Sequence, residues 1–219
     1  MATSTMRRMQ AFSSVTSRGV RRQVAVQYAT LGHMHRAAAA PVPARFPPGM
    51  SNNWLARRWY YASRSGRSYS VRQISAGDRR LLAEFALTLD VARDPDALRV
   101  LTAILFNHVI TSDSQALGFA ALEATGAGDR VIGVAAYAPI YGDRADCTVA
   151  VANTYREEQV GRTLLSTLLR QARRAGVRKL QSEMFWSNRP AQMLARSIGF
   201  SIQVAPRDRT RRLLTLELK

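Results

Sequence analysis

The segment Tyr155–Leu165, with the sequence YREEQVGRTLL, follows a predicted strand and leads directly into a predicted helix. Apolar residues alternate along residues 146–152, which is typical of a half-buried strand. Downstream they recur at helical spacing, at Leu164, Leu165, Leu168, Leu169 and Ala172. The turn between the two elements therefore presents unpaired backbone N–H groups at the N-terminus of a helix, where the helix dipole also favours an anion.

Two residues of this turn suit a phosphate ligand. Gly161 has no Cβ, so a ligand can approach its backbone closely. Arg156 adds a planar set of donors that matches phosphate oxygens.

The next segment makes the prediction more specific. Residues 177–185 are predicted to form a strand, and residues 188–200 a short helix that ends at Gly199. Together, the turn and this segment resemble the GNAT superfamily of acyl-CoA-dependent N-acyltransferases. Arg156 and Gly161 match that family's pyrophosphate turn Q/R-x-x-G-x-G/A, with Gln159 at the first glycine. We call residues 156–161 the pyrophosphate turn. The family's following motif, N-x-x-A-x-x-L-Y-x-x-x-G-F, is matched by Asn188, Ala191, Leu194, Gly199 and Phe200.

The predicted element order agrees with that resemblance. Strands are expected at residues 69–74, 117–123, 131–140, 201–204 and 213–218, and helices at 78–89, capped by Ser75–Asp78, and 96–110. The order β-α-α-β-β-β-α-β-α-β-β is the GNAT order. It implies a mixed α/β fold of three layers, with a twisted mixed sheet of about six or seven strands and helices on both faces. The resemblance extends over residues 70–217.

The charge is uneven along the chain. Of 32 Lys and Arg, twelve arginines lie in residues 1–77, which contain no acid; the remaining twenty face fifteen acids, so that part has a balance of only +5. We predict a disordered basic leader at 1–67 and one acetyltransferase domain at 68–219. The leader has three interpretations: a mitochondrial transit peptide, an extension before a true start at Met50, or an arm that binds nucleic acid. The aromatic and basic residues 54–61 suit either base stacking or a docked amphipathic helix.

Several classes of protein are excluded or disfavoured. No run of 18 apolar residues predicts a membrane span, and Cys147 alone forms no intrachain disulfide. His33, His35 and His108 form no ligand pattern, so we expect no metal. The expected location is the cytoplasm, or the mitochondrial matrix if residues 1–49 are a transit peptide. The sequence predicts no oligomeric state.

The resemblance implies which residues bind acetyl-CoA. Backbone groups of Val151 and Ala152 would pair with the pantetheine arm as an added strand does. The pyrophosphate would be bound by Arg156 and by the backbone of Glu158, Gln159, Val160, Gly161 and Arg162. Asn188 would hydrogen-bond the arm, with Met193 and Leu194 lining it; alternatively, Asn188 is only the N-cap of its helix.

For the catalytic residues, the sequence leaves more than one candidate. Related enzymes often have a tyrosine before the Gly-Phe pair, which acts as general acid to the thiolate. This chain has Ala195 at that position. The resemblance to bacterial protein-lysine acetyltransferases implies Asp146 as general base, with Glu183 as second candidate. The alternative for Asp146 is a solvated strand start.

The function implied is transfer of an acetyl group from acetyl-CoA to an amine acceptor, a protein lysine or a small molecule, by direct attack in a ternary complex. The alternative is a non-catalytic acyl-CoA sensor or a basic RNA-associated module with the same fold. The sequence does not indicate the acceptor.

Overall fold

The computed structural model describes residues 58–89, 96 and 116–219. Its sheet contains eight strands in the order β1-β2-β3-β4-β5-β6-β8-β7. The strands are β1 Trp59–Ala62, β2 Ser68–Gln73, β3 Leu117–Thr125, β4 Gly128–Tyr141, β5 Arg144–Val151, β6 Lys179–Phe185, β7 Ser201–Ala205 and β8 Asp208–Glu217. The mixed α/β fold predicted from the sequence is confirmed, with more strands than the six or seven expected.

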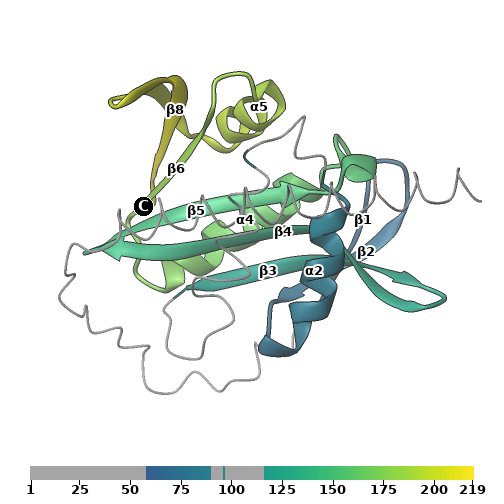
Figure 1. The fold of residues 1–219 in the computed structure, drawn as a ribbon. Helices are drawn as coiled ribbons and strands as arrows, with labels where there is room; N and C mark the ends of the chain where they lie inside the picture. Colours follow the sequence, from purple (N-terminus) through teal and green to yellow (C-terminus); the bar gives the residue numbers. More distant parts are fainter. Residues whose placement is uncertain (1–57, 90–95, 97–115) are drawn as a thin grey trace, which may run out of the picture. The chain divides into compact units, whose positions relative to one another are not determined.

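The sheet changes character between β5 and β6. All other neighbouring strands are antiparallel, whereas β5 and β6 are parallel and pair at only three positions, which end at Asp146 and Gln181. Beyond these residues the two strands diverge, as Figure 1 shows. We call the place where they part the fork: β5 after Asp146 and β6 after Gln181.

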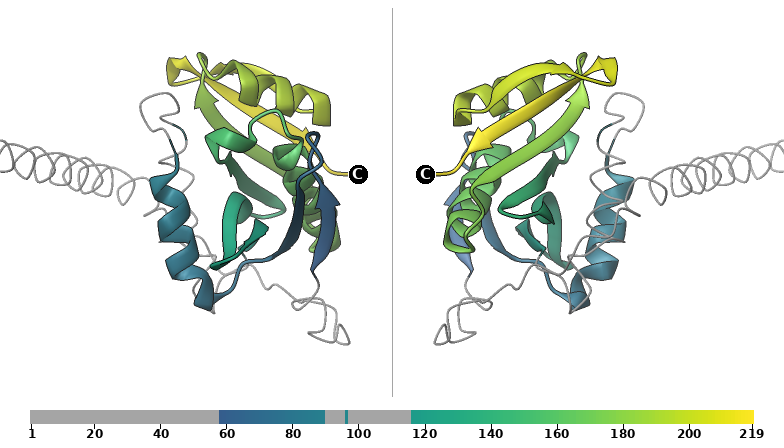
Figure 2. Two further views of the ribbon diagram at one scale, coloured as in Figure 1. Left: turned by 90° about the vertical axis from the view of Figure 1, so that its right-hand side faces the viewer. Right: turned by 90° about the vertical axis from the view of Figure 1, so that its left-hand side faces the viewer.

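The described helices are α2 Arg79–Leu87, α4 Val160–Arg174 and α5 Arg189–Ile198. Helices α2 and α4 lie on opposite faces of the sheet, both against β4 (Figure 2). Helix α4 buries the apolar stripe expected from the sequence, with Leu164 and Leu168 fully inaccessible. Its C-terminal turn contains Arg173 and Arg174, which suit the negative end of the helix dipole. In the part of the chain described, no helix is long and apolar enough to cross a membrane.

The fold begins earlier than the composition predicts. Residues 58–67 lie in the expected disordered leader, yet β1 pairs with β2, and the Trp59 ring lies 6.2 Å from that of Phe119. Arg58 pairs with Asp129 at 2.7 Å. The aromatic residues 59–61 therefore form an edge strand rather than a docked helix. The helix expected at 96–110 lies outside the described residues, apart from Asp96, which is helical.

The cap predicted before α2 is present. Ser75 and Asp78 form a capping box around a short 3₁₀ turn, Ala76–Asp78. Arg72 of β2 donates two hydrogen bonds of 2.7 Å to the Asp78 carboxylate. Burial alone would raise the pKa of Asp78, but the hydrogen bonds from Arg72 and Ser75 outweigh it and hold that pKa below its ordinary value. This ion pair ties the start of α2 to the sheet.

Candidate active site

The backbone of β5 presents hydrogen-bonding groups at the fork. The Ala152 N–H donates to the Ile132 carbonyl of β4 at 2.9 Å. In an antiparallel pair successive residues alternate between the two edges, so Val149 and Val151 direct their N–H and C=O away from β4. Since β6 has already diverged there, no described strand pairs with these groups, and they suit an added, strand-like ligand.

This register corrects one predicted contact. Ala152 was expected to pair with the pantetheine arm, but its N–H is used by Ile132 and its carbonyl accepts the Tyr155 N–H at 2.9 Å. Val149, not Ala152, shares the free edge of β5 with Val151 in this register. The sequence contained a usable signal, because residues that share an edge are two apart, not one.

The pyrophosphate turn leads into α4 through two left-handed residues. Glu157 has φ 64° and Gln159 has φ 65°, a region that side chains other than glycine rarely adopt. Thr163 N–H donates to the Gln159 carbonyl at 3.0 Å, so the N–H groups of Val160, Gly161 and Arg162 precede this helical hydrogen bond. Those N–H groups lie where the helix dipole is positive.

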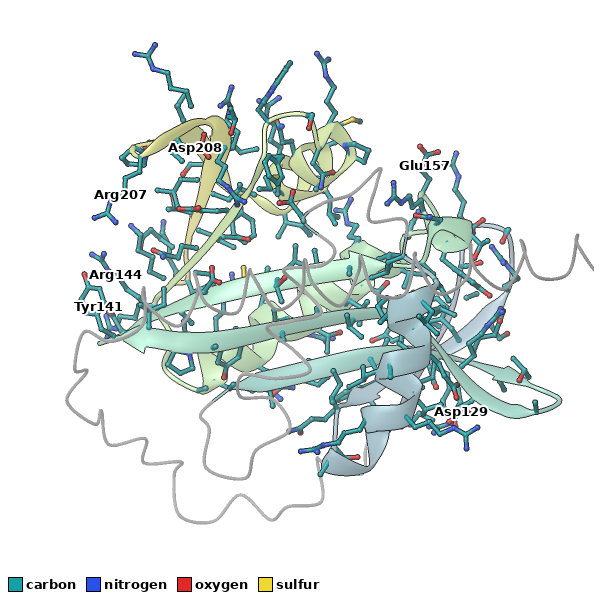
Figure 3. The ribbon with its side chains drawn as sticks, viewed as in Figure 1. Asp129, Tyr141, Arg144, Glu157, Arg207 and Asp208 are labelled. Carbon is teal, nitrogen blue, oxygen red and sulfur yellow. The ribbon has the colours of Figure 1, made fainter. Side chains whose placement is uncertain are left out.

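The two acidic residues of the turn are directed elsewhere. Glu158 accepts a hydrogen bond from the Ser65 backbone N–H at 2.8 Å and lies 3.5 Å from the Arg67 guanidinium. The hydrogen bond from Ser65 is the main reason that the Glu158 pKa is lowered. Glu157 is exposed and projects outward from the turn in Figure 3. The carboxylate of Glu158 therefore serves the β1–β2 turn.

A network of side chains from neighbouring elements holds the residues just before the pyrophosphate turn. Tyr155 is buried, its hydroxyl donates to Glu123, and Glu123 also pairs with Arg130 at 2.5 Å. The hydrogen bond from Tyr155 is the largest cause of the lowered pKa of Glu123. The Arg67 guanidinium lies 4.0 Å from the centre of the Tyr155 ring and donates to the Thr154 carbonyl at 3.0 Å. Strands β1 to β4 thus fix the turn in place.

Gly161 lies in a packed position. A Cβ built there would be 3.2 Å from Leu194 of α5 and 3.3 Å from Val151 of β5. A side chain at this position would therefore press on Leu194 and Val151, in addition to obstructing any approach by a ligand. Arg156 and Arg162 are exposed, and Val160 is buried.

The predicted residues of α5 have different surroundings. Asn188 is the N-cap, its Oδ1 accepts from the Ala191 N–H at 3.3 Å, and its Nδ2 donates to Asp96 at 3.2 Å. Leu194 packs against the core, whereas Met193 is 71% exposed. Asn188 and Leu194 therefore lie toward the fork, and Met193 faces solvent.

Both candidate bases lie on one face of the sheet. A Cβ on Gly133 would contact Leu164 and Val160, so Gly133 and its partner Val151 face α4. By alternation, Asp146 and Thr148 face the opposite side, the side of α2. Asp146 is level with Gln181 in the parallel pair, so Glu183, two residues on, shares that side. The structure thus places the two carboxylates on the same face of adjacent strands.

Neighbouring residues are less suited to acid–base chemistry. Ala195 is 4% exposed, so its position is inside the packing of α5. Tyr137 faces α4, and burial raises its pKa to about 12. Tyr141 lies beside Arg144 at the β4–β5 turn, where β5 and β6 are still paired (Figure 3). Among the described residues, no three His, Cys, Asp or Glu gather as metal ligands.

A residue that the sequence did not single out also reaches the fork. Asp96 is 7% exposed and accepts hydrogen bonds from Phe185, at the end of β6, and from Asn188. No local pattern connects Asp96 with residues about ninety positions later, so only the tertiary structure identifies it.

A sheet that parts between two parallel strands, beside the N-terminus of a following helix, is that of the N-acyltransferases that use an acyl-CoA cosubstrate. The chain belongs to the acetyltransferase (GNAT) family, whose model matches residues 82–200. The resemblance seen in the sequence is confirmed.

Several solved structures share the fold at low identity. The GNAT domain of PAT from S. lividans is 18% identical with a TM-score of 0.59, over 77% of this chain and 99% of that one. A GNAT-family acetyltransferase from Staphylococcus aureus Mu50 is 16% identical with a TM-score of 0.53, over 69% and 99%. A cAMP-binding acyltransferase from Mycobacterium smegmatis is 15% identical with a TM-score of 0.53, over 78% of this chain and 54% of that one. No curated protein matches the chain.

Proposed function

We propose that this protein transfers an acetyl group from acetyl-CoA to an amine acceptor by direct attack in a ternary complex. The observation that supports this most is the edge of β5, where Val149 and Val151 direct backbone groups toward the fork. Such an edge suits the amides of a pantetheine arm, and the N-terminus of α4 beside it suits the pyrophosphate. Acetyl-CoA, when bound, supplies an activated acyl carbon.

Asp146 is the proposed general base. An amine with a pKa of about 10.4 is almost wholly protonated at pH 7, so it must lose a proton before it can attack. Asp146 would accept that proton directly or through a water. As the carbon–nitrogen bond forms, the carbon–sulfur bond breaks and the thiolate leaves. Since a thiol has a pKa of about 8.5, the thiolate can take its proton from water, without an acid at position 195.

Two measurements test this function. Acetyl-CoA at a hundredfold excess over its Kd should stabilise the fold by about 2.7 kcal/mol, seen as a raised Tm. Release of free thiol, with and without a lysine peptide, a polyamine or an aminoglycoside, then separates transfer from simple binding. A Tm shift without amine-dependent thiol release favours a non-catalytic sensor, and the absence of both contradicts the proposal. Longer acyl-CoAs in the same assays test the preference for acetyl.

The base is tested by two matched substitutions. Asp146→Asn should keep the acetyl-CoA Tm shift and lose about a hundred- to ten-thousandfold in rate at neutral pH. Part of the rate should return at high pH, where the amine is already neutral. Glu183→Gln is the control on the neighbouring strand and should have a smaller effect. Full turnover in Asp146→Asn with loss in Glu183→Gln would assign the base to β6.

We also propose a cytoplasmic location, with the mitochondrial matrix as the alternative if residues 1–49 are cleaved. Determination of the N-terminus of the protein isolated from its own cells tests this, because an unprocessed Met1 contradicts cleavage.

A further inference from the structure

A buried carboxylate with one unused oxygen lies at the fork. Asp96 is 7% exposed. Its Oδ2 accepts hydrogen bonds from the Phe185 backbone N–H at 3.0 Å and from Asn188 Nδ2 at 3.2 Å. Its Oδ1 is buried and has no hydrogen-bond partner in the described part of the chain. Because an unsatisfied buried carboxylate oxygen is costly to the fold, it calls for a physical explanation.

The hydrogen bond to Phe185 locates this carboxylate. Along a strand, successive N–H groups point to opposite edges. Trp186 N–H donates to Thr210 of β8 at 2.8 Å, so the N–H of Phe185 points to the other edge, which faces β5. Asp96 therefore lies on the β6 side of the fork, between the strands that part there.

A second unused polar atom lies on the β5 side. Thr148 is two residues beyond the last position paired with β6, and its Oγ1 is buried without a hydrogen-bond partner. The described residues contain only one more such atom, Gln73 Oε1 on β2, and two strands, β3 and β4, separate β2 from β5 in the sheet. Two of the three unsatisfied atoms among the described residues thus flank the fork, Thr148 Oγ1 on β5 and Asp96 Oδ1 beside the end of β6.

We propose that Asp96 and Thr148 form the acceptor subsite, and that this subsite takes a positively charged primary amine. An ammonium group has three donors and no acceptor, which complements a carboxylate oxygen and a hydroxyl oxygen that accept no hydrogen bond from the described residues. Thr148 shares a face of β5 with Asp146. The amine held by Asp96 and Thr148 would therefore lie beside the proposed base. This inference rests on the proposed function.

The test separates acceptor binding from cosubstrate binding. Asp96→Asn retains an oxygen that can accept from Phe185 and removes the charge. Thr148→Val retains the shape and removes a buried hydroxyl without a partner, so the fold should be equally stable or more stable. For a lysine peptide, a polyamine or an aminoglycoside at saturating acetyl-CoA, each variant should raise the amine KM about ten- to hundredfold. The acetyl-CoA Tm shift should stay as in the wild type. Asp129→Asn, at the start of β4 and paired with Arg58, is the control and should leave both unchanged.

The outcomes distinguish failure of the acceptor subsite from failure of the proposed acetyl transfer. A wild-type protein that transfers acetyl groups, while both variants keep the wild-type KM, overturns the subsite alone. Loss of the acetyl-CoA Tm shift in Asp96→Asn also overturns it, because Asp96 would then support the cosubstrate through Asn188. If Asp96→Asn does not fold, Thr148→Val decides by itself. A wild type with neither Tm shift nor thiol release overturns the proposed function and this inference with it.

Discussion

Gln159 departs from the family's turn in identity but keeps the required backbone. The resemblance places a glycine at this position, and the structure gives Gln159 a φ of 65°, in the region that favours glycine. A side chain in this region costs about 1–2 kcal/mol, part of which a glycine loses again through the entropy of the unfolded chain. The backbone of the turn is therefore preserved at some expense of stability.

Gln159→Gly should raise the free energy of unfolding by up to about 1 kcal/mol and keep acetyl-CoA binding, because the left-handed strain is removed. Chemical denaturation measures the first, and the acetyl-CoA Tm shift measures the second. Gln159→Ala is the control, since it removes the side chain and keeps the Cβ. A glycine variant less stable than the alanine variant would contradict this account.

At the scale of single elements, helices are held to the sheet at their N-termini. Helix α2 begins at the Arg72–Asp78 pair, whose Asp78 side chain is only 7% exposed. Helix α4 begins where Gly161 allows contact with Val151 and Leu194. The attachment of α2 is ionic, so it should respond to pH and to loss of charge. The attachment of α4 is steric, so it should respond to side-chain size.

Asp78→Asn should lower the free energy of unfolding at pH 7 by about 1–3 kcal/mol, because the charge-assisted hydrogen bonds from Arg72 are lost. The Asp78 pKa is lowered in the fold, so its stabilisation is complete above the ordinary value of 3.8 and is lost as pH falls through the lower folded value. The difference between wild type and variant should therefore shrink below about pH 4, as measured by denaturation across pH. Glu84→Gln, in the exposed Arg80–Glu84 pair, should change stability by less than about 1 kcal/mol.

Gly161→Val should abolish the acetyl-CoA Tm shift and also lower the stability of the unliganded protein by about 1–3 kcal/mol, since the added atoms meet Val151 and Leu194. The sequence alone predicts only the first effect. A double-mutant cycle with Leu194→Ala measures the steric part, because the valine should cost less where Leu194 is truncated. An additive cycle would show that Leu194 is not the residue that restricts this position.

At the scale of the whole molecule, we expect residues 1–49 to be dispensable for the fold and the segment with β1 and the β1–β2 turn to be part of it. Removal of residues 1–49 should leave the Tm and the acetyl-CoA Tm shift unchanged. Removal of residues 1–67 should lower both, because β1 and the contacts of Ser65 and Arg67 with the pyrophosphate turn are lost. Thermal melting of the two truncated proteins beside the full chain tests this. If the shorter truncation unfolds the protein, the basic leader is part of the fold.

The strands and helices with clear periodicity could be predicted from the sequence, since burial of one face fixes where apolar residues occur. Strand β1 could not, because four aromatic and small residues among arginines show no sustained pattern. For β5, sequence reasoning chose Ala152 beside Val151, whereas the register gives Val149 and Val151 the same edge. Binding of acetyl-CoA at that edge stays a prediction. Asp96 depends on a contact 89 residues away in sequence, which no local pattern contains.

The short pairing of β5 with β6 has a consequence for the cooperativity of unfolding. Three paired positions join the antiparallel ladder β1–β5 to the ladder β6–β8–β7. Such ladders often exchange their amide hydrogens as separate cooperative units. We expect the amides of β6 and β8 to exchange through partial opening, at a lower free energy than those of β3 and β4. A ligand that bridges both edges of the fork would join the two units, so acetyl-CoA should slow amide exchange in β8 as well as in β6.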